Sequence, residues 1–514
     1  EPGSDDFGPG PSGGQGDGEV VHAVHCREAA GGTARRARAR TGPRQPAPSR
    51  QPALACRRMQ LAAAALISAA LMWLAFPPVN LGLLVFVAPV PLLWALRRAT
   101  TRREATWVGL IYGVAFFGGM LWWIYTLGAV AWFPLVGTMA AYTVGYALLM
   151  YVVRLWSPSL WWAVAVGGWA LFEFARSRFP LGGFPWGAAG FPIGTIPGAR
   201  GAAQWIGPTG WGVLVIGFAA SLVLLAEEEP DRRPLEAMVA IIVVLSALGL
   251  VLSPEAGGQA VRVAIVQGNS PCPREHCTNE KQLIYDAHLG LTRTIAAGSA
   301  DLVVWPEDSF GGSVNPTFNP EVAAQMGAEA VRIGAYLLAG GSRSAGPAEW
   351  DNFNILFGPN GAMLGEYMKR HPVPFGEFVP LRNLLKFIPQ LDQVPRDLRR
   401  GQGPVVFSMA LGDYSFRLGS VISFEGAFPR YLRSEVKAGA QVAVVATNEG
   451  SYGRGPASDQ LIEMVRLNAA AMGVDVIHAA VTGHSTFLFA DGSRSRAETG
   501  LFTGEVLYGS ARVQ

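Results

Sequence analysis

A nucleophile-type side chain follows an apolar segment near the C-terminal third of the chain. Ser423 comes directly after the run that ends at Ile422, and Glu425 lies two residues further on. Many hydrolases and acyltransferases present the reacting atom at such a strand-to-helix turn. Serine is also a favoured helix N-cap, so this stretch alone favours the simpler interpretation of a helix that begins at Ser423.

A carboxylate stands at a second strand end. Glu307 follows the apolar segment 301–305, which Pro306 interrupts. Open α/β sheets bind ligands beyond the carboxyl ends of their strands. A carboxylate held there against apolar walls can have its pKa raised toward that of a general base. Taken alone, Glu307 is more simply a solvated loop glutamate.

A lysine and another carboxylate share a third loop. Lys369 follows a predicted strand and opens a proline-rich stretch that ends at Glu377. A lysine so placed can stabilise the oxyanion of an acyl-transfer step, although a single lysine is usually a surface residue. The second carboxylate in the same stiff loop favours a shaped site.

The elements that must position these side chains lie within 259–514. We expect strands at 261–267, 301–305, 335–342, 352–357, 362–368 and 441–446, with helices near 279–297, 320–335 and 456–472. About 250 residues of this kind make one α/β domain with a large buried sheet.

The preceding half has the composition of a membrane protein. The chain is 50% hydrophobic and 15% charged, whereas soluble domains carry about 25% charged residues. Seven apolar runs have about the 17–25 residues needed to cross the hydrocarbon core: 59–76, 79–96, 107–126, 129–152, 159–175, 210–226 and 235–253. No small-residue cleavage site follows the first run, so we expect a retained anchor rather than a signal peptide.

Loop charges predict the orientation. The basic positions 57–58, 97–103, 154 and 232–233 all fall on one side of the membrane if the N-terminus is cytoplasmic. Because seven is odd, we expect everything after about residue 254 to lie outside the cytoplasm. The loop 176–209 then lies on the outer side. Its stretch Phe184-Pro185-Trp186, with Trp205 and Trp211 beyond, either anchors helices at the interface or walls a groove for lipid tails.

Residues 1–57 are rich in Gly, Pro, Ala and Arg, so we expect them to be disordered. The first methionine is Met59, and what precedes it is compatible with an upstream extension. The expected domains are therefore 1–57, a membrane domain at 58–254 and an α/β domain at 255–514. Four cysteines without a zinc pattern predict no metal site, and Cys272 and Cys277 could pair only in an oxidising compartment. A net charge of +3 gives no indication of nucleic-acid binding.

Together these stretches resemble known proteins. Glu307 in Trp-Pro-Glu, Lys369 in Lys-x-His-x-Val-Pro-Phe-Gly-Glu and the elbow at 422–425 are similar to the Glu-Lys-Cys triad of the nitrilase superfamily. Further motifs resemble the apolipoprotein N-acyltransferase family, and the resemblance covers roughly 59–510: 76–78, the Glu173…Arg176 pair, 183–187, 266–269 and 447–450.

The resemblance implies an αββα sandwich on the outer face of an α-helical membrane bundle, in the bacterial cytoplasmic membrane. Members of this family take an acyl chain from a phospholipid onto a cysteine and pass it to the α-amine of a diacylglyceryl-cysteine on an apolipoprotein, without a cofactor. The implied roles are a general base at Glu307, an oxyanion stabiliser at Lys369 and supporting groups at Glu377, Phe424 and Glu425, the last in a mobile arm. Phospholipid, apolipoprotein and the bilayer are the implied partners.

Three features depart from the family pattern. Ser423 stands at the nucleophile position, and a hydroxyl ionises far less readily than a thiol with a pKa near 8.5. An oxygen ester is also a poorer acyl donor to an amine than a thioester. Ser423 therefore fits an engineered replacement, a slow natural enzyme or a chain without catalysis. The family's tryptophan soon after 266–269 is missing, and no eighth apolar span precedes Gln514.

Three functions follow. The first is a phospholipid-dependent N-acyltransferase. The second is a catalytically silent membrane scaffold, for example for a polyprenol-phosphate mannosyltransferase, because similar halves occur fused to such enzymes. The third is a membrane-tethered amidase that uses water, and the Phe-Pro-Trp-Gly motif of the membrane half weighs against it.

Overall fold

The computed structural model describes residues 50–227, 231–254, 258–272 and 277–513. The predicted disorder at 1–57 falls almost entirely outside these residues. The chain divides into a unit Glu1–Met59 and a unit Gln60–Gln514, and the second unit contains both the helical bundle and the α/β domain described below.

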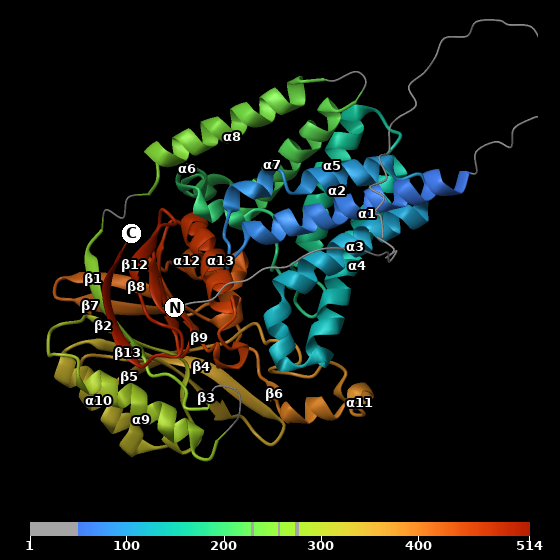
Figure 1. Cartoon of the computed structure of the whole chain (residues 1–514). Coiled ribbons are helices and arrows are strands. Elements are labelled where there is room, and N and C mark those ends of the chain that lie inside the picture. Colours follow the sequence, from blue (N-terminus) through green and yellow to red (C-terminus); the bar gives the residue numbers. More distant parts are fainter. Residues whose placement is uncertain (1–49, 228–230, 255–257, 273–276, 514) are drawn as a thin grey trace, which may run out of the picture. The chain divides into compact units, whose positions relative to one another are not determined.

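Residues 60–254 form a helical bundle, drawn from blue to green in Figure 1. Close packing of α3 on α4 depends on glycine, because a Cβ at Gly113 would lie 2.7 Å from the Cα of Ala140. The helices are α1 Arg50–Ala75, α2 Pro89–Arg98, α3 Arg102–Met120, α4 Ala129–Val153, α5 Pro158–Arg176, α6 Pro197–Gly201, α7 Ala203–Leu225 and α8 Arg233–Val251.

The described part of the chain has four helices long and apolar enough to cross a membrane: Leu54–Ala75, Ala129–Val153, Ala203–Leu225 and Arg233–Val251. The predicted span at 79–96 is not one helix, because it divides into the 3-10 helix Gly82–Phe86 and the ten-residue α2, which begins at Pro89. Helices α3 and α5 have 19 residues each but include charged side chains. The count of seven spans therefore stays a prediction.

The α/β domain consists of two sheets. The first has the order β13-β1-β2-β3-β4-β5, with β6 beside β4, and the second has the order β12-β11-β10-β9-β8-β7. Strands β1 to β3 are parallel, as are β8 to β10. The strands are β1 Ala260–Gln267, β2 Leu302–Gly311, β3 Tyr336–Ser344, β4 Glu349–Phe357, β5 Met363–Met368, β6 Asp397–Leu398, β7 Val406–Leu411, β8 Tyr414–Ile422, β9 Val442–Thr447, β10 Asp475–Ala480, β11 Thr486–Leu488, β12 Arg494–Glu498 and β13 Glu505–Arg512.

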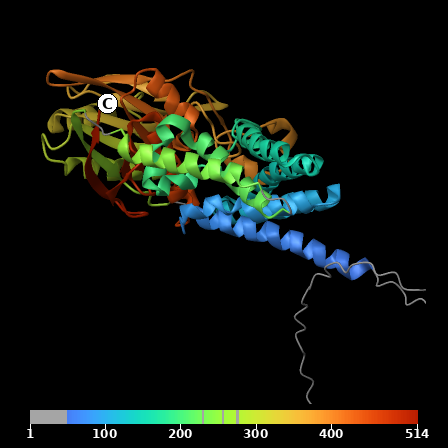
Figure 2. The ribbon, with the colours of Figure 1, turned by 90° about the horizontal axis from the view of Figure 1, so that it is seen from above.

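Helices cover both outer faces of the stacked sheets. Helices α9 Glu280–Arg293 and α10 Pro320–Ile333 lie on the first sheet, and α12 Pro429–Lys437 and α13 Ala457–Met472 lie between the second sheet and the bundle (Figures 1 and 2). The short helix α11 Arg382–Leu385 follows β5. Apolar residues of both inner faces, such as Val304 and Val444, form the core between the sheets. The predicted αββα sandwich is confirmed.

The outer face of the second sheet is not exposed to solvent. Val421 of β8, Val445 of β9, Ile462 and Val465 of α13 and bundle residues such as Trp211 belong to one continuous cluster of buried side chains. The α/β domain and the bundle therefore share a hydrophobic core.

Candidate functional site

Glu307 lies inside β2 rather than beyond its end. Pro306 has no amide hydrogen, and the pairing of β2 with β3 shifts between Trp305 and Phe310, so the strand continues past the interruption to Gly311. The expectation that Pro306 ends the strand is therefore wrong. The carboxylate of Glu307 is buried, with 5% of the residue exposed.

Three donors hold the Glu307 carboxylate. Its Oε1 accepts hydrogen bonds from Lys369 Nζ at 2.9 Å and from Asn352 Nδ2 at 2.7 Å. Its Oε2 accepts one from the amide of Asn448 at 2.7 Å. The donors come from the ends of β5 and β9 and from β4, so both sheets fix this carboxylate.

Lys369 follows β5 directly, as predicted, and its ammonium group lies between two carboxylates. Nζ donates to Glu307 Oε1 and, at 2.6 Å, to Glu377 Oε1. The other oxygen of Glu377 accepts the amide hydrogen of Val373 at 2.8 Å, which closes the proline-rich loop on itself. The structure thus brings Glu307, predicted at one strand end, together with Lys369 and Glu377, predicted to share a loop after another strand.

Burial and charge oppose each other in this cluster. Burial alone would lower the Lys369 pKa, but Glu307 and Glu377 hold that pKa above its usual value, so the ammonium stays charged. Burial raises the pKa of Glu377, and Lys369 opposes this increase. Lys369 is only 1% exposed, so these interactions act with little screening by water.

Ser423 begins a turn at the end of β8. The strand stops at Ile422, and the 3-10 helix η6 Ser423–Ala427 leads into α12. Ser423 has φ of +53°, in the left-handed region that L-residues rarely adopt. Its Oγ accepts a hydrogen bond from Thr447 Oγ1 at 3.2 Å, and Thr447 precedes the Asn448 that binds Glu307. The end of β9 therefore contacts both candidate groups.

Glu425 is interior rather than part of an exposed arm. It is fully buried and accepts four hydrogen bonds: from Tyr367 Oη at 2.6 Å and from the amides of Ile422 at 2.8 Å, Arg370 at 2.6 Å and His371 at 2.9 Å. This carboxylate satisfies the backbone where β8 and the Lys369 loop meet, and the mobile arm that the resemblance implies at Glu425 stays a prediction.

Phe424 connects the turn to the bundle. Its ring stacks on Trp186 at 5.5 Å and on Phe184 at 5.8 Å between centroids. Trp186 and Pro185 are buried, and Phe184 is partly buried. These three residues therefore pack where the bundle meets the α/β domain. Trp211 is fully buried, and Trp205 remains 45% exposed.

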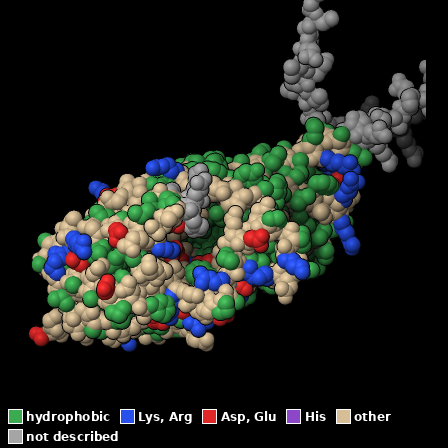
Figure 3. All heavy atoms as spheres, turned by 90° about the horizontal axis from the view of Figure 1, so that it is seen from below, with side chains coloured by type: hydrophobic (Ala, Val, Ile, Leu, Met, Phe, Trp, Pro, Cys, Tyr) green, Lys and Arg blue, Asp and Glu red, His purple; other side chains and the backbone are tan. Residues whose placement is uncertain are grey.

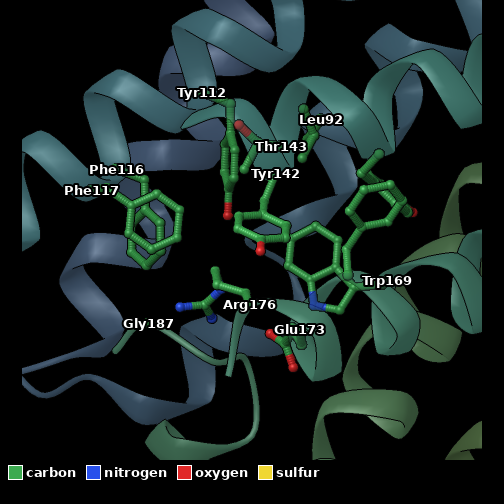
Figure 4. Close-up of a pocket in the computed structure, with 12 residues that line it drawn as sticks. Leu92, Tyr112, Phe116, Phe117, Tyr142, Thr143, Trp169, Glu173, Arg176 and Gly187 are labelled. Atoms are coloured by element: carbon green, nitrogen blue, oxygen red, sulfur yellow. The ribbon is translucent and has the colours of Figure 1, made fainter. Parts of the chain in front are cut away.

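The Glu173…Arg176 pair at the end of α5 supports this aromatic contact. Arg176 Nη1 donates to the carbonyl of Phe184 at 2.9 Å and also to that of Trp186. Glu173 accepts the amide hydrogen of Ala189 at 2.8 Å. Figure 4 shows both charged groups directed into a pocket of the bundle, together with the hydroxyls of Tyr112 and Tyr142.

The surface between the two halves is hollowed. Figure 3 shows hydrophobic side chains on the bundle side of this hollow and acidic groups within it. Within the described residues, no group of three or more His, Cys, Asp or Glu side chains is arranged to hold a metal ion. The charged centre of the site is the lysine and its two carboxylates.

Sequence reasoning missed several residues that shape the site. Asn352 and Asn354 are two apart in β4, whose end is apolar, and this spacing places both on one face. Asn352 binds Glu307, and Asn354 donates to Ser420 Oγ of the other sheet at 2.8 Å. Their amides in the middle of a buried strand were the signal that could have identified them.

Models of known protein families match both halves of the chain. The model of the apolipoprotein N-acyltransferase N-terminal domain matches residues 68–221, and that of the carbon-nitrogen hydrolase domain matches residues 262–512. The apolipoprotein N-acyltransferase of Geobacter metallireducens is 30% identical over 492 residues, which cover 87% of this chain and 89% of that protein. That of Sinorhizobium medicae is 29% identical over 449 residues, 81% of each chain.

Among solved structures, a mutant of the Nesterenkonia AN1 amidase, from the nitrilase superfamily, covers 49% of this chain and 90% of its own, with 17% identity and a TM-score of 0.36. The match to the Geobacter protein extends over both the bundle and the α/β domain. The chain belongs to the apolipoprotein N-acyltransferase family of the nitrilase superfamily.

Proposed function

We propose that this protein transfers a fatty acyl chain from a phospholipid to the α-amine of a diacylglyceryl-cysteine on an apolipoprotein. The observation that carries the proposal is the buried Lys369 ammonium between Glu307 and Glu377. The chain belongs to a family of N-acyltransferases, and the end of β9 links this cluster to Ser423, which lies on a left-handed turn. That arrangement supplies a base, an oxyanion stabiliser and a nucleophile.

In the first step, Ser423 Oγ attacks the ester carbonyl of the phospholipid. Glu307 accepts the hydroxyl proton and then donates it to the glycerol oxygen that leaves with the lysophospholipid. The Lys369 ammonium stabilises the negative charge of the tetrahedral intermediate. The product is an acyl ester on Ser423.

In the second step, the neutral α-amine of the apolipoprotein attacks that ester. Glu307 removes a proton from the attacking nitrogen and returns a proton to Ser423 Oγ as the C–O bond breaks. An amide forms and the serine hydroxyl is restored. Glu377 fixes the position of Lys369 through both steps. As the second carboxylate beside the ammonium, after Glu307, it also helps to keep the lysine protonated.

Ser423 makes both steps slow by comparison with a thiol. The serine hydroxyl ionises far less readily and depends more on Glu307. Its hydrogen bond with Thr447 positions the oxygen but doesn't supply a base. We therefore expect a slow enzyme whose rate rises when Ser423 is replaced by cysteine.

We infer further that the bundle is a multi-pass membrane domain with the α/β domain on the extracytoplasmic face. Arg97 at the end of α2 donates to the carbonyl of Arg154 after α4 at 3.3 Å and to Glu227 after α7 at 3.0 Å. These basic loops thus gather at one end of the bundle. Trp123 follows the end of α3, and Trp186 lies in the loop after α5. Both contact the α/β domain at Gln460.

Basic loops favour the cytoplasmic side, so this arrangement supports an outward-facing α/β domain. The disulfide between Cys272 and Cys277 fits an oxidising compartment. We propose that the bilayer, its phospholipids and membrane-bound apolipoproteins are the partners. The names of the relatives reported above give no support to a mannosyltransferase partner.

Intact-mass spectrometry of the purified protein in phospholipid vesicles tests the function. We expect an acyl adduct on Ser423, its transfer to a diacylglyceryl-cysteine peptide and faster turnover in Ser423→Cys. Ser423→Ala and Glu307→Gln are the matched controls and should form no adduct. If wild type and a folded Ser423→Cys both form none, the silent scaffold replaces the enzyme. Release of free fatty acid without transfer to the peptide would instead indicate an amidase-like hydrolase.

A further inference from the structure

One glutamine of the α/β domain makes four hydrogen bonds to the membrane half. Gln460, in the first turn of α13, is 2% exposed. Its Oε1 accepts the indole hydrogens of Trp123 at 3.0 Å and Trp186 at 3.1 Å. Its Nε2 donates to the carbonyls of Pro77 at 3.3 Å and Met120 at 3.2 Å. The amide thus uses both lone pairs and both hydrogens.

The two tryptophans are neighbours, 6.2 Å between ring centroids, and each contacts a different segment of the candidate active site. Trp186 stacks on Phe424, the neighbour of Ser423. Trp123 packs edge-to-face on Tyr452, 4.7 Å between centroids, and Tyr452 closes the turn that begins after Asn448. One tryptophan therefore supports the nucleophile turn, and the other supports the segment that holds the general base.

The helix that carries Gln460 also holds the nucleophile turn directly. Asn468 Nδ2 donates to the carbonyl of Gly426 at 2.9 Å, two turns further along α13. Val465 packs so closely there that a Cβ at Gly426 would lie 2.9 Å from its Cγ2. With a rise of about 1.5 Å per residue, Gln460 and Asn468 are about 12 Å apart on one rigid element.

We propose that Gln460 is a positioning residue that fixes Trp186 of the bundle against Phe424 of the nucleophile turn and Trp123 against Tyr452 of the segment after Asn448. It sets the distance between the nucleophile turn and the membrane, so that the ester of a bilayer phospholipid reaches Ser423. It touches no reacting atom. The substrate part of this inference rests on the proposed acyl transfer, whereas the positioning part rests only on the contacts above.

Hydrogen–deuterium exchange in lipid nanodiscs tests the positioning without any activity. Gln460→Met keeps the length of the side chain and removes all four hydrogen bonds. We expect exchange to rise by about tenfold in 119–124, 184–189 and 423–428, and to stay unchanged in β1 and α9. The matched control is Gln282→Met on α9, whose amide binds Asp286 on the surface. Unchanged exchange in all three segments overturns the proposal.

Kinetics then separate positioning from general destabilisation. We expect Gln460→Met to lower kcat/KM for bilayer phospholipid by about tenfold or more, and to change acylation of Ser423 by a water-soluble short-chain nitrophenyl ester by less than about threefold. Equal losses for both donors overturn the proposal. If wild type reacts with neither donor, the acyl-transfer function fails while the exchange result still stands. Trp123→Phe, which removes one donor, serves if Gln460→Met doesn't fold.

Discussion

Replacing Lys369 by methionine should leave two buried carboxylates facing each other. Nζ lies 2.9 Å from Glu307 and 2.6 Å from Glu377, and the lysine is 1% exposed. Removing one partner of a buried ion pair costs about 3–5 kcal/mol because the remaining charge stays uncompensated. In a domain of about 250 residues, that loss lowers the melting temperature by about 10 °C or more.

The loss should depend on pH in a defined direction. Burial already raises the pKa of Glu377 in the wild type, and without Lys369 only the hydrogen bond from the Val373 amide opposes that increase. The folded variant then keeps a proton up to a higher pH than the unfolded chain does. Its stability therefore rises as the pH falls from 8 toward 5, and its deficit relative to wild type shrinks.

Thermal unfolding in detergent at pH 5, 6.5 and 8 measures this effect, with the acyl adduct followed in parallel. Lys281→Met is the matched control, because Lys281 pairs with Asp308 near the surface and should cost less than about 1 kcal/mol. Lys369→Met combined with Glu377→Gln removes one of the facing charges and should recover much of the stability at pH 8. An equal deficit at pH 5 and pH 8, or no recovery in the double variant, would refute the buried charge network.

Three further outcomes follow from single contacts. Ser423→Gly should raise the unfolding free energy by about 0.5–1 kcal/mol, because glycine adopts the φ of +53° without strain. The acyl adduct should disappear. A loss of stability in denaturant titrations would show that the backbone of Ser423 is not strained. Glu425→Gln should lower the unfolding free energy by about 2–4 kcal/mol, because the amide nitrogen that replaces one oxygen cannot accept two of the four hydrogen bonds. A melting temperature within about 2–4 °C of wild type would contradict this prediction. Glu449→Gln should be more stable than wild type at pH 8 and not at pH 4.5. Burial raises the Glu449 pKa to about 7, so the unfolding free energy of the wild type falls by up to about 3 kcal/mol as the pH rises from 4.5 to 7. Parallel pH–stability curves for the two proteins would exclude this.

The sequence predicted the elements whose side chains alternate or run apolar over enough length. Strands β1, β3, β4, β5 and β9 and helices α9, α10 and α13 appear close to their expected bounds. Strands β7, β10, β11 and β12 of the second sheet and β13 of the first sheet were missed for physical reasons. Strand β11 has only three residues, β12 is mostly polar and exposed, and β13 pairs with β1 across more than two hundred residues. None of these carries a local pattern.

The candidate site was predicted in its residue types but not in its geometry. Glu307, Lys369 and Ser423 stood out because each follows an apolar run. The support around them depends on contacts between distant segments, such as Trp123 with Gln460, which are 337 residues apart. Nor does a serine in a sequence reveal a left-handed backbone. Nothing local in the sequence shows that four donors converge on Glu425.

The hydrophobic core shared by the second sheet, α13 and the bundle has a consequence for biogenesis. Val421, Val445 and Val465 belong to the same cluster of buried side chains as residues of the bundle, so the α/β domain does not complete its burial of apolar surface alone. The bundle precedes it in the chain and is synthesised first. The α/β domain therefore reaches its native state only against the bundle that precedes it. Until it docks, its exposed apolar face makes it a target for chaperones and proteases.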